Sequence, residues 1–113
     1  MNDIVQQAQG LGKSIASSSQ AALLRKARQA LHADEQAMKT LQEFETHSHK
    51  MMELEQAGKP VEVDDKHRLE QLQAKLVGME SFKKFSAAQV EYVDLMRQVS
   101  DAIRKELSAT EED

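Results

Sequence analysis

Two groups of side chains in the sequence have the types and spacing to hold a metal ion. The denser group is Glu43, Glu45, His47 and His49. Each glutamate precedes a histidine by four residues, so each pair shares one helix face, but the two pairs point about 200° apart. One metal ion would therefore meet at most two ligands from this helix, whereas a catalytic zinc ion needs three protein ligands. We interpret the group as charge pairs on an exposed helix.

The second group is Asp64 and His67, which reproduce the carboxylate-x-x-histidine spacing of di-iron helical bundles. Such sites need two of these motifs and two further inward carboxylates, whereas the sequence holds the motif once. It lies at the predicted start of a helix, where Asp64 or Asp65 can act as the N-cap. A metal-dependent helical-bundle enzyme that uses Asp64, His67, His47 and His49 is the alternative to the function predicted below.

Other catalytic chemistry has little support in the sequence. There is no cysteine, which excludes disulfides, thiolate zinc sites, cysteine-ligated iron–sulfur clusters and thiol nucleophiles within the chain. We find no glycine-rich phosphate loop, no nucleophile elbow and no serine with a plausible base. We therefore expect a protein that is not an enzyme, with no catalytic residues, no cofactor-binding residues and no metal ligands.

Length and charge narrow the class of protein further. The chain has 113 residues, a length suited to one small domain, and a formal net charge of −4. An acidic chain lacks the excess of Lys and Arg that binds nucleic acid or anionic lipid, so we expect no direct contact with either. No secretory signal and no membrane-spanning run is recognisable. We expect a cytoplasmic protein.

The longest periodic stretch, residues 81–107, predicts the helix against which the others pack. Its apolar residues recur at alternating steps of three and four, which places them on one side of a helix. They are Phe82, Phe85, Tyr92, Met96, Val99 and Ile103, with Gln89 at the polar position. A flanking row widens this face, so we expect partners on more than one side. That row is Ala88, Val93, Leu95 and Leu107.

Four further helices are predicted before it, over residues 4–15, 20–32, 35–57 and 64–77. A serine cluster, Asp34 and the Gly58–Pro60 stretch separate them, since these residue types cap or end helices. The apolar face of the third helix broadens at Met51 and Met52. Methionine recurs on surfaces that accept partners and also fills gaps in cores, and both interpretations stay open for this pair.

These elements predict an all-α fold, an antiparallel bundle of about five helices in which two are long. The long helices would each span about 35–40 Å, more than a compact bundle of this length needs. We therefore expect dimerisation through their apolar faces. The predicted interface consists of Met51, Met52, Phe85, Tyr92, Met96, Val99 and Ile103. Residues 1–107 form the predicted domain, and 108–113 a disordered acidic tail.

The order and spacing of these features resemble the YlbF/YmcA family of small helical bacterial proteins. The resemblance covers nearly the whole chain. It is carried by Ala8, Leu11 and Ile15, by Leu31 to Ala37, by Leu41 and Phe44, by Glu55 to Lys59, by Leu69, Leu72 and Leu76, and by Phe82, Phe85, Ala88, Tyr92 and Ile103.

The resemblance implies a cytoplasmic, self-associating helical protein that acts without catalysis. Relatives in this family look like regulatory adaptors, which work with a further protein and influence messenger RNA processing by ribonuclease Y. They affect competence, sporulation and biofilm formation. Some relatives contribute cysteines to iron–sulfur clusters, a feature that this cysteine-free chain does not share. The family offers no catalytic motif to transfer.

We therefore predict a non-enzymatic regulatory or adaptor protein that acts through helix-mediated contacts between proteins. The expected partners are further copies of the chain, in a homodimer or tetramer, and another regulatory protein or a ribonuclease complex. The complex would influence RNA processing, competence, sporulation or biofilm formation.

Overall fold

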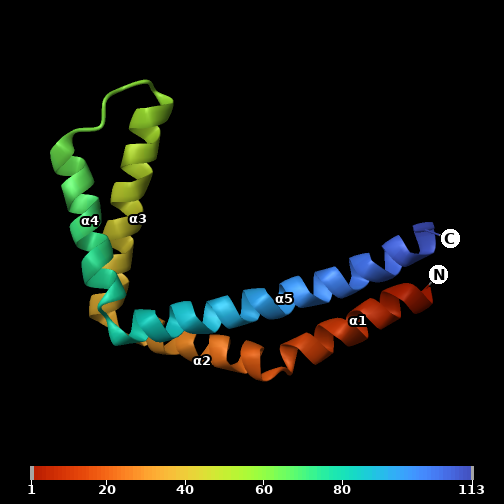
Figure 1. Ribbon diagram of the computed structural model, residues 1–113. Helices are drawn as coiled ribbons and strands as arrows, with labels where there is room; N and C mark the ends of the chain where they lie inside the picture. The colour runs from red at the N-terminus through yellow and green to blue at the C-terminus, as the bar shows by residue number, and fades with distance from the viewer. Residues whose placement is uncertain (1, 113) are drawn as a thin grey trace. The chain divides into compact units, whose positions relative to one another are not determined.

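The computed structural model of the protein describes residues 2–112, which form five helices and no strand. The helices are α1 (Asn2–Ala16), α2 (Ser19–Ala33), α3 (Glu35–Gln56), α4 (Val63–Val77) and α5 (Glu80–Glu112) (Figure 1). The predicted all-α fold is confirmed, with α3 and α5 as the two long helices. No helix among these residues combines the length and hydrophobicity required to cross a membrane.

The chain divides into two compact units. Unit 1 contains the residues up to Ala27 together with those from Ser86 onwards, and unit 2 is Arg28–Phe85. Within unit 1, α1 runs in the opposite direction to the long C-terminal part of α5 (Figure 1). Within unit 2, α3 and α4 pack against each other as an antiparallel hairpin. The division is finer than the single domain predicted over residues 1–107, which stays a prediction.

Local chemistry explains where α2 and α3 begin. The hydroxyl oxygen of Ser18 accepts a hydrogen bond from the amide of Ala21 at 3.1 Å, which caps the start of α2. The carboxylate of Asp34 accepts from the amide of Ala37 at 3.1 Å and caps α3, as predicted. Each side chain accepts a hydrogen bond from a backbone N–H group that has no partner within the first helical turn.

The end of α3 is a Schellman motif. Gly58 adopts a φ of 72°, which favours glycine because it has no Cβ. The amide of Lys59 donates to the carbonyl of Leu54 at 2.9 Å, and the amide of Gly58 donates to the carbonyl of Glu55 at 3.1 Å. These two bonds satisfy carbonyl groups that the last helical turn leaves free.

Two helix boundaries differ from prediction. Glu62 is the N-cap of α4 and makes no side-chain capping bond, so Asp64 and Asp65 lie in the first turn instead of at the cap. There they still favour the helix, because carboxylates interact well with its positive end. At the other end of the chain, α5 continues to Glu112. No Gly or Pro follows residue 107 to end the helix, so residues 108–112 are helical where a disordered tail was predicted; Asp113 lies outside the described residues.

The hydrophobic core is thin in both units. In unit 1 the buried apolar side chains are Ala21 and Leu24. In unit 2 they are Leu31, Ala37, Leu72 and Leu76, accompanied by Thr40, whose hydroxyl donates to the carbonyl of Gln36 at 3.0 Å. No large side chain of the described residues is completely shielded from solvent. The helices therefore leave much of their apolar surface uncovered.

Candidate functional site

The predicted interface residues are divided between the two units. Tyr92, Met96, Val99 and Ile103 lie on the part of α5 that belongs to unit 1, whereas Met51, Met52 and Phe85 belong to unit 2. Of the adjacent methionines, Met51 is half-buried and Met52 is 52% exposed. Met52 is thus available to a partner, and the role of the whole set as an interface stays a prediction.

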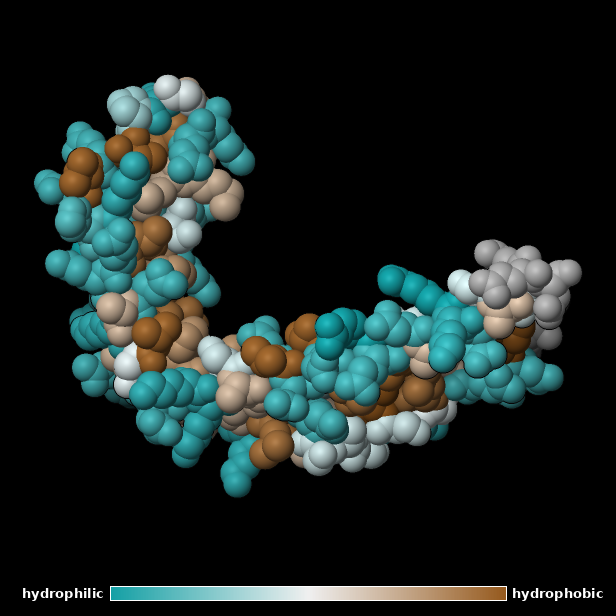
Figure 2. Space-filling view, in the orientation of Figure 1, coloured by the Kyte–Doolittle hydropathy of each residue, from teal (hydrophilic) through white to brown (hydrophobic). Residues whose placement is uncertain are grey.

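In unit 1 the apolar surface becomes more exposed toward the ends of the chain. On α5, Tyr92, Met96 and Val99 are half-buried, but Ile103 is 50% and Leu107 63% exposed. On α1, Ile15 is half-buried and Ile4 is 77% exposed. In the face drawn in Figure 2, hydrophobic side chains reach the surface along the part of the chain formed by α1 and α5.

Two exposed apolar side chains of unit 1, Ile4 and Leu107, are not among the predicted interface residues. Both positions follow the three- and four-residue periodicity of their helices, which is the signal that could have identified them. The exposure of Leu107 could not be read from that pattern, because periodicity shows which face is apolar and not whether a neighbouring helix covers it.

A second apolar patch lies on a different face of α5. Val90 and Val93 are both exposed, and they line a shallow hollow of about 450 Å³ together with Gln89, Asp94 and Arg97. Asp94 pairs with Arg97 and accepts a hydrogen bond from the side-chain amide nitrogen Nε2 of Gln98 at 2.8 Å. These contacts are within one helix, so they hold the polar rim of the hollow in place.

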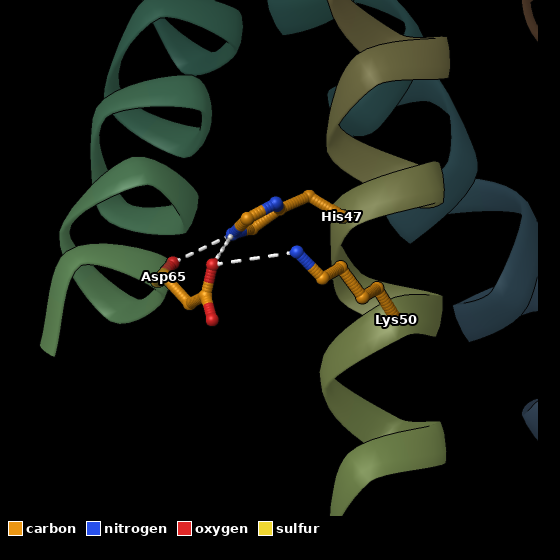
Figure 3. A network of polar contacts seen from close by, with 3 residues as sticks. All are labelled: His47, Lys50 and Asp65. Carbon is orange, nitrogen blue, oxygen red and sulfur yellow. Dashed lines mark hydrogen bonds and ion pairs between the residues drawn. The ribbon is translucent and has the colours of Figure 1, made fainter. Parts of the chain in front are cut away.

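A polar network joins α3 to the first turn of α4 (Figure 3). Nε2 of His47 lies 2.7 Å from the backbone carbonyl oxygen of Asp65 and 3.9 Å from its carboxylate. Because a carbonyl oxygen can only accept, Nε2 carries the proton in this contact. Nζ of Lys50 lies 3.7 Å from the same carboxylate. The network fixes the start of α4 against the middle of α3.

A groove between α3 and α4 adjoins this network. Arg68 on α4 donates to the carboxylate of Glu43 on α3 at 3.2 Å. The groove has a volume of about 550 Å³ and is lined by Lys39, Gln42, Glu43, Thr46, His47, Lys50, Arg68 and Leu72. Leu72 is buried, whereas the charged side chains reach solvent.

The structure does not bring together the residues of the alternative metal site. His47 faces Asp65, whereas His49 pairs with Glu53 at 2.8 Å on the exposed side of α3. Asp64 and His67 are both exposed. Among residues 2–112, no three histidine or carboxylate side chains are placed to share a metal ion. The predicted four-residue and three-residue spacings therefore do not converge on one centre.

Asp34 makes a contact that the sequence did not predict. Besides capping α3, its carboxylate accepts a hydrogen bond from the hydroxyl of Ser81 at 2.8 Å, which ties the start of α5 to the start of α3. The bonds from Ser81, from the Ala37 amide and from the Gln36 amide lower the pKa of this carboxyl below its ordinary value, because they favour the charged form.

The five helices of residues 2–112, with the α3–α4 hairpin and the exposed apolar side chains, define an all-helical protein. The sequence model of the family described as "Control of competence regulator ComK, YlbF/YmcA" matches residues 4–108, and the chain belongs to this family. The description of the family fits a regulatory role. A search of curated proteins gives no match to the chain.

Proposed function

We propose that this protein is a non-enzymatic regulatory adaptor that self-associates through unit 1 and binds other proteins through its helices. The observation that carries the proposal is the exposure of Ile4, Ile103 and Leu107 on the apolar faces of α1 and α5. Several exposed large apolar side chains in one unit are typical of a surface that another protein covers.

The free energy of burying these three side chains supports a second copy of the chain as the protein that covers them. Removing the exposed part of each of these side chains from water contributes roughly 1–2 kcal/mol. In a symmetric dimer every contact occurs twice, because the same face of each copy takes part. The combined gain, roughly 6–12 kcal/mol, is of the same size as the cost of association, which is estimated at about 4–15 kcal/mol.

The proposal for the regulated process is based on the family to which the chain belongs. We propose that the self-associated protein works with another regulatory protein or with a ribonuclease complex, and thereby influences RNA processing, competence, sporulation or biofilm formation. The support is the match to a family described by its control of a competence regulator. Recognition would be helix on helix, with apolar anchors at three- and four-residue spacing.

Self-association is tested by measuring the solution mass with light scattering over a concentration series. We expect the wild-type protein to have twice the mass of one chain. Ile103→Glu places a charge on the proposed contact, so its dissociation constant should rise at least about tenfold.

Val77→Glu is the matched control. Val77 is 49% exposed and Ile103 50% exposed, but Val77 lies on α4 in unit 2. We expect this variant to keep the wild-type mass. A wild-type protein that stays monomeric throughout the series, or an equal effect of the two substitutions, would contradict self-association through unit 1.

A further inference from the structure

We propose that the groove between α3 and α4 is a docking site for an acidic helical segment of a partner protein. This inference rests on the proposed adaptor function. It states where on the molecule a partner binds and which chemistry the partner segment has. The groove lies wholly within unit 2.

The charges that line the groove have a strong bias. Lys39, Lys50 and Arg68 are cationic, and Glu43 is the only carboxylate among the lining residues. The whole chain, by contrast, has a formal charge of −4. A positive region on an acidic protein attracts carboxylates locally and orients an acidic partner as it approaches.

The cations are not committed to strong internal ion pairs. Among the described residues, no carboxylate lies within ion-pair distance of Lys39. Lys50 reaches Asp65 at 3.7 Å and Arg68 reaches Glu43 at 3.2 Å, and both basic side chains are largely exposed. Exposed pairs of this kind contribute at most about 1 kcal/mol, so a partner carboxylate can compete for the same cations.

The dimensions of the groove suit a helix. Lys39, Gln42, Thr46 and Lys50 are spaced by three and four residues along α3 and form one stripe. The stripe extends about 16 Å at a rise of 1.5 Å per residue, which is about three helical turns. A helix with carboxylates on one face would complement the cationic side chains of this stripe.

A protein segment fits the groove better than a nucleic acid does. No Phe, Tyr or Trp lines the groove within the described part of the chain, so nucleobases have no aromatic side chain on which to stack.

The test uses the full-length protein labelled with ¹⁵N and two synthetic helical peptides. The first is alanine-based and carries glutamate at three- and four-residue spacing on one face, and the second has glutamine at those positions. We expect the glutamate peptide to shift the amide signals of residues 39–50 and 68–72, and to bind at least about fivefold more tightly than the glutamine peptide.

Two substitutions locate the contact. Lys39→Glu should weaken binding of the glutamate peptide about fivefold, while circular dichroism and light scattering show an unchanged fold and mass. Lys66→Glu is the matched control, because Lys66 is exposed on α4 and does not line the groove. We expect its effect to be less than about twofold.

Three outcomes would overturn the proposal. They are equal binding of the glutamate and glutamine peptides, an equal effect of the two lysine substitutions, and tighter binding of a single-stranded RNA probe than of the glutamate peptide. If self-association fails, the wild-type protein has the mass of one chain in light scattering, whatever the peptides do. The two proposals therefore fail in distinguishable ways.

Discussion

At the scale of single residues, the carboxylate of Asp34 connects two helix starts that lie far apart in the sequence. It caps α3 through the backbone amide of Ala37 and accepts a hydrogen bond from the hydroxyl of Ser81 at the start of α5. Both donors stabilise the ionised carboxylate, so its pKa in the folded protein lies below the ordinary value of 3.8. The contribution of Asp34 to stability is therefore linked to pH.

This linkage predicts a loss of stability in acid. Because the folded pKa lies below the unfolded one, the contribution is fully present above pH 3.8 and is lost as the pH falls through the folded pKa. Asp34→Asn keeps an oxygen that can cap the helix but does not titrate in this range. We expect the wild-type protein to lose more thermal stability than this variant when the pH is lowered from about 5 to below 3.

Ser81→Ala isolates the cause of the lowered pKa. Without the hydroxyl donor, the pKa of the Asp34 carboxyl should rise toward its ordinary value, which a ¹³C NMR titration of the carboxyl carbon measures directly. An unchanged pKa in this variant, or identical acid sensitivity of the wild type and Asp34→Asn, would remove the Ser81 contact as the source of the linkage.

The sequence predicted the capping role of Asp34 but not its bond to Ser81. A cap is a local pattern, in which a short polar side chain precedes a helical run. The bond to Ser81 depends on where the start of α5 lies in space, which no local pattern determines. For the same reason, the expected pair of Glu43 with His47 is replaced by the contact of His47 with Asp65 on α4. His49 instead pairs with Glu53, four residues further along the same helix.

At the scale of helices, two glycines should respond in opposite directions to the same substitution. Gly10 lies inside α1, and a Cβ added there would meet no atom within 4 Å. We expect Gly10→Ala to raise the free energy of unfolding by about 0.5–1 kcal/mol, because alanine loses less backbone entropy in a helix. Gly58 has a φ of 72°, which is unfavourable for a residue with a Cβ. Gly58→Ala should therefore lower the free energy of unfolding by about 1–2 kcal/mol.

Urea unfolding followed by circular dichroism at one fixed protein concentration measures both changes. The concentration must be held constant because association would add to the stability of the folded state. A destabilising effect of Gly10→Ala would show that another backbone approaches this side of α1 closely, and light scattering of the variant would reveal whether that neighbour is a second copy.

The helices themselves were largely predictable, because apolar periodicity and the helix-ending Gly58 are patterns of residues close together in the sequence. The errors lie at the boundaries of α4 and α5. The residue type of Asp64 and Asp65 predicts that one of them is the cap, but the chain becomes helical at Val63. Residues 108–112 were assigned as disordered because of their acidic, polar composition, yet they extend α5. Composition describes solvent preference and does not by itself end a helix.

At the scale of the whole molecule, the sequence could not separate core residues from surface residues. Met51 and Met52 are neighbours, and only the arrangement of α4 beside α3 leaves one half-buried and the other exposed. The charged groove has the same origin, because it needs Arg68 from α4 beside Lys39 and Lys50 from α3. A site formed by residues of two helices depends on how those helices pack. A local sequence pattern does not show which helices lie side by side.

The thin core of unit 1 connects the stability of the molecule with the proposed self-association. The buried apolar side chains of unit 1 are Ala21 and Leu24, whereas Ile4, Ile103 and Leu107 remain exposed. If a second copy covers these residues, folding and association are one equilibrium, and mass action raises the unfolding temperature with protein concentration. An unfolding enthalpy of roughly 0.7 kcal/mol per residue for two chains predicts a rise of about 6 °C over a hundredfold increase in concentration. Thermal unfolding followed by circular dichroism measures this rise. At each concentration Ile103→Glu should unfold at a lower temperature than the wild-type protein, because it weakens association, whereas Val77→Glu should not lose this contribution. A wild-type unfolding temperature that does not change over this range would mean that each chain folds alone, with its apolar face left open to a partner of a different kind.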